Sequence, residues 1–169
     1  MRPQGEEMKA KRIVVLGFGN PLASDDGLGP EVLKQIRRIK LPKNVKVYDA
    51  DPLRTNLPSI LKGAEKVIVI DALKTGDQKA SLLKFRLNEL ETLSKLPTPL
   101  SVHSLHSIDL LLLCKKIMGE EFPKEVIILG AEVENLEGFH ASLSEKVRRT
   151  IPGLIKMVFD ELSIGNLPD

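Results

Sequence analysis

The 169-residue sequence has a single cysteine, almost no net charge and no long hydrophobic run, and each scarcity excludes a class of protein. Cys114 has no second cysteine to pair with, which excludes a disulfide scaffold and predicts a reducing compartment, the cytoplasm. Lys and Arg number 25 and Asp and Glu 23, so a net charge of +2 without a basic stripe argues against nucleic acid as a partner. No apolar stretch reaches the roughly 18–20 residues that cross a bilayer, and the polar N-terminus does not resemble a secretory signal, so we expect no membrane insertion.

The length and composition indicate one domain with an ordinary hydrophobic core. Hydrophobic residues make up 42% of the chain and charged residues 28%, as in typical globular proteins. Chains of about 100–200 residues usually form one domain. Residues 1–11 are polar and show no periodicity, and a start at Met8 would remove most of them. We therefore expect a flexible tail over residues 1–11 and a single domain over residues 12–169.

Short apolar strands alternate with amphipathic helices along the chain. This alternation predicts a three-layer α/β/α sandwich around a five-stranded, mostly parallel sheet. The connection before the fourth strand is too short for a parallel crossover, so we expect that strand to be antiparallel or at an edge. The predicted strands are residues 12–16, 45–49, 66–70, 80–87 and 126–129, and the predicted helices are residues 29–41, 53–62, 105–117 and 142–162.

Acidic residues follow two of the predicted strands, where sheets of this kind bind ligands. Asp25 and Asp26 come after the first strand and its glycine-rich loop, and Asp71 ends the third strand. One of the two neighbouring aspartates would be an ordinary helix cap, and Asp71 could accept hydrogen bonds from loop amides. Alternatively, the carboxylates converge. With His103 or His106, they would then suit a divalent transition metal.

Two other chemistries fit the sequence poorly. The loop Gly17-Phe18-Gly19-Asn20 has Leu22 where a dinucleotide fingerprint needs its third glycine, and the acids after it would repel a pyrophosphate. A serine or cysteine hydrolase is disfavoured because no G-x-S-x-G elbow is present and Cys114 falls within a leucine-rich helical face.

The glycine-rich loop carries a resemblance to a known family. Residues 15–29, with the pattern G-x-G-N-x-x-x-x-D-D-G-x-G, resemble the opening signature of the hydrogenase maturation proteases. Later segments agree in order: residues 70–72 resemble the strand-end aspartate motif, residues 101–109 the histidine segment, and residues 138–147 the start of the closing helix. The resemblance covers about residues 12–162.

The resemblance implies an endopeptidase that removes the C-terminal extension of a nickel-iron hydrogenase large-subunit precursor after nickel insertion. It assigns metal binding and catalysis to Asp26, Asp71 and His103, with the divalent metal being nickel carried by the substrate. The spacing to Asp109 favours His103 over His106, and a contribution from His140 stays open. A non-cleaving metal-dependent binding module or chaperone for the precursor, and a related peptidase with another substrate, are the alternatives.

Overall fold

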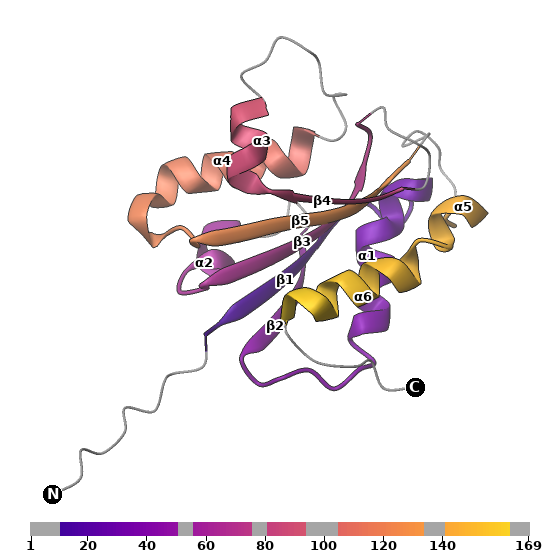
Figure 1. Cartoon of the computed structure of the whole chain (residues 1–169), viewed down its shortest axis with the longest axis horizontal. Coiled ribbons are helices and arrows are strands. Elements are labelled where there is room, and N and C mark those ends of the chain that lie inside the picture. The colour runs from indigo at the N-terminus through magenta and orange to yellow at the C-terminus, as the bar shows by residue number, and fades with distance from the viewer. Residues whose placement is uncertain (1–10, 51–55, 76–80, 94–104, 134–140, 163–169) are drawn as a thin grey trace, which may run out of the picture.

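A five-stranded mixed sheet forms the centre of the computed structural model, which describes residues 11–50, 56–75, 81–93, 105–133 and 141–162. The strand order is β2-β1-β3-β5-β4 (Figure 1), with four parallel strands and β4 pairing antiparallel with β5 at one edge. The expected α/β sandwich and its antiparallel edge strand are therefore confirmed. The strands are β1 (Ile13–Phe18), β2 (Val45–Ala50), β3 (Lys66–Leu73), β4 (Leu82–Arg86) and β5 (Glu125–Glu132).

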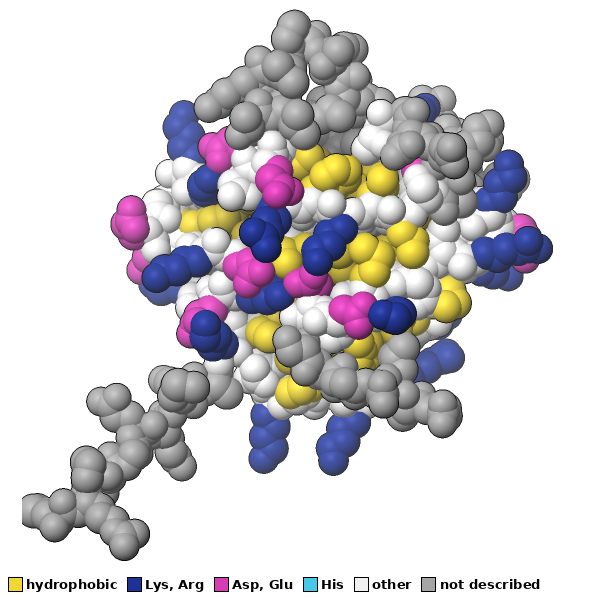
Figure 2. All heavy atoms as spheres, viewed as in Figure 1, with side chains coloured by type: hydrophobic (Ala, Val, Ile, Leu, Met, Phe, Trp, Pro, Cys, Tyr) yellow, Lys and Arg dark blue, Asp and Glu magenta, His cyan; other side chains and the backbone are white. Residues whose placement is uncertain are grey.

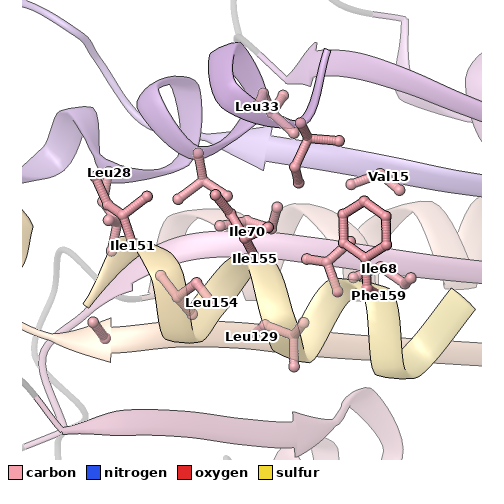
Figure 3. Packing of buried hydrophobic residues seen from close by; sticks show 14 of the residues in the cluster. Val15, Leu28, Leu33, Ile68, Ile70, Leu129, Ile151, Leu154, Ile155 and Phe159 are labelled. Carbon is pink, nitrogen blue, oxygen red and sulfur yellow. The ribbon is translucent and has the colours of Figure 1, made fainter. Parts of the chain in front are cut away.

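Helices cover both faces of the sheet, because alternate residues of each strand point to opposite sides. On one face, Val15, Ile68 and Leu129 pack against α1 and α6 (Figure 3). On the other, Val67 and Ile128 pack against α2, α3 and α4. Burial on both faces explains why the central strands are continuous apolar runs. The helices are α1 (Leu28–Ile36), α2 (Leu57–Leu61), α3 (Leu87–Leu93), α4 (Leu105–Met118), α5 (Glu145–Arg148) and α6 (Ile151–Leu162), with 3₁₀ turns η1 (Ser24–Gly27) and η2 (Gly119–Glu121).

The third and fifth strands are longer at their carboxyl ends than the sequence predicted. Asp71 lies within β3 and pairs with Gly130, which lies within β5 instead of ending it. A Cβ at position 130 would stand 2.6 Å from the carbonyl oxygen of Asp71, so glycine permits the close approach that lets pairing continue to Leu73 and Glu132. Asp71 is thus held by sheet hydrogen bonding and does not begin a loop.

Two predicted helices have different boundaries in the structure. The helix predicted at residues 53–62 is the short α2, with Asn56 as its N-cap and Pro58 in the first turn, where no helical N–H is needed. Residues 51–55 lie outside the described residues. The helix predicted at residues 142–162 is two helices, α5 and α6. The break falls just before α6, and Pro152 lies in the first turn of α6. The sequence analysis did not predict α3, which follows β4 without a loop.

Charged side chains of both signs are interspersed on the face shown in Figure 2, which agrees with the small net charge. Among the ion pairs of the described residues, Lys66 lies 2.7 Å from a carboxylate oxygen of Glu161, which also pairs with Lys84. These partners hold the pKa of Glu161 below its usual value against the effect of burial. None of the described helices is long and apolar enough to span a membrane.

Candidate functional site

The glycine-rich loop after β1 folds back on itself and places Asp26 against its own backbone. Gly19 has a φ of +126°, and a Cβ there would lie 1.8 Å from the carbonyl oxygen of Asp26, so the loop requires glycine at this position. The backbone N–H of Asn20 donates to Oδ2 of Asp26 at 2.8 Å. The Asp26 carboxylate is consequently held at the start of the loop, beside the end of β1.

Asp25 ties the same loop to the closing part of the chain. Its carboxylate accepts hydrogen bonds from the backbone N–H of Ser144 at 2.7 Å and from the Ser144 hydroxyl at 3.0 Å. Ser144 in turn caps α5 by accepting from the N–H of Val147. The interpretation of an aspartate as the cap of the following helix is wrong: Gly27 is the N-cap residue of α1, without a side-chain hydrogen bond.

Replacing Asp25 with alanine is expected to destabilise the fold by about 1.5–3 kcal/mol, the range for hydrogen bonds to a charged group. The N–H and hydroxyl of Ser144 would both lose their acceptor. Urea unfolding at neutral pH measures the change. Asp160→Ala is the matched control, because it removes only an exposed pair with Lys156 and should cost less than about 0.5 kcal/mol. Equal costs for the two variants would contradict the tether.

Asp71 is buried beneath the first turns of α4, with 5% of its surface exposed. The hydroxyl of Ser107 donates a hydrogen bond to Oδ2 of Asp71. The pKa of Asp71 is raised to about 7, chiefly by burial: the hydrogen bond from Ser107 lowers it, the charge of Asp26 raises it, and the hydrogen bond from Ala72 lowers it. Burial and the neighbouring charge of Asp26 together disfavour the ionised form of this carboxylate.

The ends of β1 and β3 meet beneath the start of α1, which brings Asp26 and Asp71 into electrostatic range of each other. A Cβ at Gly29 would stand 2.1 Å from the carbonyl oxygen of Phe18 and 2.7 Å from that of Ile70. Because Gly29 has no side chain, the helix can rest directly on both strand ends. The expected convergence of the two carboxylates on one edge of the sheet is therefore present in the structure.

The histidine part of the predicted site is not tested by the geometry. His103 and His140 lie outside the described residues, as does the side chain of His106. Among the residues that the structure describes, no group of three or more His, Cys, Asp or Glu side chains is placed to hold a metal ion. The assignment of a metal to Asp26, Asp71 and His103 therefore stays a prediction.

Ser107 and Glu132 are two polar residues of this region whose roles the sequence analysis missed. Ser107 falls on the buried stripe of α4 with Leu111 and Cys114, and a serine on such a stripe is the signal that could have found it. Glu132 is 4% exposed, and its carboxylate accepts from the N–H of Thr75 at 2.8 Å and from its hydroxyl at 2.7 Å. Glu132 thereby anchors the segment that leaves β3 after Asp71.

A pocket of about 210 Å³ lies at the opposite end of the sheet and does not belong to this site. Its lining includes Arg86 at the end of β4, Phe122 in the segment that connects α4 to β5, and Val126 at the start of β5. Val126 precedes Gly130, the partner of Asp71, by four residues, or about 13 Å of strand. Its volume is below the roughly 300–1,000 Å³ of ordinary ligand pockets.

Known proteins resemble this chain in sequence and in fold. The chain is 30% identical over 166 residues to the coenzyme F420 hydrogenase subunit delta of Methanothermobacter thermautotrophicus, covering 90% of this chain and 96% of that protein. It is 28% identical to a putative hydrogenase maturation protease of Methanocaldococcus jannaschii, covering 92% and 99%. An endopeptidase from Escherichia coli has the same fold, with a TM-score of 0.76, 26% identity and coverage of 92% and 94%.

The family assignment follows from the match along nearly the whole chain. The hydrogenase maturating endopeptidase HybD from Escherichia coli also shares the fold, with a TM-score of 0.73 at 24% identity and coverage of 90% and 92%. The family model described as hydrogenase maturation protease matches residues 10–161, which include the glycine-rich loop, Asp71 and the closing helices. The chain belongs to the hydrogenase maturation protease family.

Proposed function

We propose that this chain is an endopeptidase that removes the C-terminal extension of a nickel-iron hydrogenase large-subunit precursor once nickel has been inserted. The observation that carries the proposal is the electrostatic interaction of Asp26, in η1, with Asp71, in the carboxyl-terminal part of β3. Family membership supports the reaction class. Nickel arriving with the precursor is part of the substrate, and the site would read whether it is loaded.

The donor set fits a divalent transition metal. Two carboxylates close enough to raise a pKa by mutual repulsion become more favourable beside a cation, which offsets both the repulsion and the burial cost. Asp26 and Asp71 would supply oxygen ligands and His103 an imidazole nitrogen, a mixture that suits such ions. A bound ion would polarise the scissile carbonyl as a Lewis acid.

The residues around the two carboxylates keep them in position for this role. The N–H of Asn20 orients Asp26, and the hydroxyl of Ser107 orients Asp71. A cation bound beside Asp71 would lower its raised pKa and keep the carboxylate ionised, as an oxygen ligand requires.

His103 is proposed as the third ligand because of its place in the chain. It precedes Ser107 by four residues, so the span of an extended chain keeps their Cα atoms within about 14 Å of each other. Since the Ser107 hydroxyl contacts Asp71, the site lies within reach of a histidine at position 103. His106 and His140 are the competing candidates, and single alanine variants of each histidine separate them.

Cleavage of a purified precursor tests the proposal. Wild-type protein is mixed with nickel-loaded or nickel-free large-subunit precursor, and mass spectrometry follows loss of the C-terminal peptide and maps the cut. We expect cleavage of the loaded form only, and losses of about 100-fold or more for Asp26→Ala and His103→Ala. Asp160→Ala, on the exposed side of α6, is the control with unchanged activity. Full processing by both site variants would contradict the assignment of Asp26 and His103 to the site.

A binding role is the second candidate, and one comparison favours it. The relative from Methanothermobacter thermautotrophicus is named as a subunit of a hydrogenase. If this chain forms a stable complex with the loaded precursor and no mass is lost, the protein is a binding module. Cleavage followed by release identifies the enzyme.

A further inference from the structure

Leu22 is a large apolar side chain that is exposed to solvent beside the candidate site. It is 64% exposed and belongs to the glycine-rich loop, four residues before Asp26. The other exposed large hydrophobic residues of the described chain lie outside this loop, and the most exposed of them is Ile117 in α4, at 67%. Single exposed leucines are common, so the position and rigidity of Leu22 carry the argument.

The backbone around Leu22 is fixed by hydrogen bonds. Its N–H donates to the side-chain carbonyl of Asn20 at 2.9 Å, and the N–H of Ala23 donates to the backbone carbonyl of Asn20 at 3.0 Å. The same Asn20 donates its N–H to the Asp26 carboxylate at 2.8 Å. Ser24 follows with a φ of +49°, an uncommon conformation that surrounding contacts must hold. Leu22 is therefore presented at a set position relative to Asp26.

Apolar groups from a second segment lie next to this loop. A Cβ at Gly27, the residue after Asp26, would be 3.3 Å from the Cα of Pro21 and 3.7 Å from a methyl group of Leu143. Pro21 is exposed and Leu143 is half-buried. The region that carries Asp26 thus combines one carboxylate with apolar surface, a mixture that suits a peptide with an apolar side chain close to the reacting group.

We propose that Leu22 is a specificity-determining contact that packs against an apolar side chain of the precursor, in the segment adjoining the bond that is cut. The inference rests on the proposed function, because it takes the precursor as the occupant of this site. The precursor is the occupant because Leu22 and Asp26 belong to one hydrogen-bonded loop, so a polypeptide bound at Asp26 lies against the loop that presents Leu22. Apolar contact there favours an apolar residue and disfavours a charged one.

Steady-state cleavage of the nickel-loaded precursor by Leu22 variants tests the proposal. We expect Leu22→Ala to raise KM about 10-fold or more with kcat within about twofold, since removing apolar contact weakens binding without touching the reacting groups. Leu22→Asp should raise KM further, and Leu22→Met, which keeps an apolar side chain of similar size, should have a KM close to that of the wild type. Ile117→Ala is the matched control, because Ile117 is equally exposed but lies ten residues beyond Ser107 on α4, and its KM should not change.

Two results would overturn the proposal. A KM for Leu22→Asp equal to that of the wild type would show that Leu22 does not touch the precursor. A fall in kcat alone, with KM unchanged, would show that Leu22 only shapes the loop around Asp26. Failure of the proposed function gives a different result. In that case the wild-type protein neither cleaves nor binds the loaded precursor, so the precursor is not the partner of Leu22 either.

Discussion

Asp71→Asn is expected to stabilise the metal-free protein above pH 7 by up to about 4 kcal/mol, while abolishing precursor processing. The fold raises the pKa of Asp71 from an ordinary 3.8 to about 7, chiefly by burial. Each pKa unit corresponds to about 1.4 kcal/mol of preference for the protonated form. Asparagine is neutral and keeps an oxygen that can accept the hydrogen bond from Ser107. The wild type tolerates an unfavourable carboxylate that the variant does not carry.

The pH dependence of this difference identifies its cause. Between about pH 4 and pH 7 the folded protein binds a proton at Asp71 that the unfolded chain has released, so wild-type stability falls as pH rises. Below pH 4 both states are protonated and the advantage of Asp71→Asn should vanish. Urea unfolding with a chelator, at pH 4 and pH 8, measures both limits. A gain of the same size at both pH values would contradict the role of the buried charge.

Gly29→Ala is expected to be severely damaging, costing at least about 3–4 kcal/mol or preventing folding. The added Cβ would stand 2.1 Å from the carbonyl oxygen of Phe18 and 2.7 Å from that of Ile70. These are backbone atoms in paired strands, so no side chain can turn aside to relieve the contact, and overpacking of this kind is severe. Displacing α1 would also separate Asp26 from Asp71, so any folded protein should process poorly.

Gly153→Ala is the matched control for this prediction. Gly153 also lies in a helix, α6, and a Cβ there would stand 2.6 Å from a terminal methyl group of Leu82. Leu82 is 43% exposed and can change rotamer, while alanine favours the helix by up to about 1 kcal/mol. Gly153→Ala should therefore be neutral or stabilising in thermal unfolding. A comparable loss in both variants would show that the contact at Gly29 is not special.

The sequence predicted most of the sheet because its strands are apolar runs that are buried on both faces. It did not predict which apolar residues at the end of α4 contact the core. Ile117, an apolar residue of the helix predicted at 105–117, is 67% exposed, and Met118 packs against the core instead. The buried stripe runs through Ser107, Leu111 and Cys114, and the next position at helical spacing is 118. Cys114 was correctly predicted to be buried.

The sequence by itself determined the alternation of strands and helices, the glycine-rich loop and the aspartates at two strand ends. Only the tertiary structure decided which carboxylate does what. Asp25 and Asp26 are neighbours with the same chemistry, yet Asp25 binds Ser144, 119 residues away, while Asp26 acts on Asp71. Contacts so distant along the chain have no local signal. The pKa of Asp71 likewise depends on burial beneath α4, which exists only after the helix has packed against the sheet.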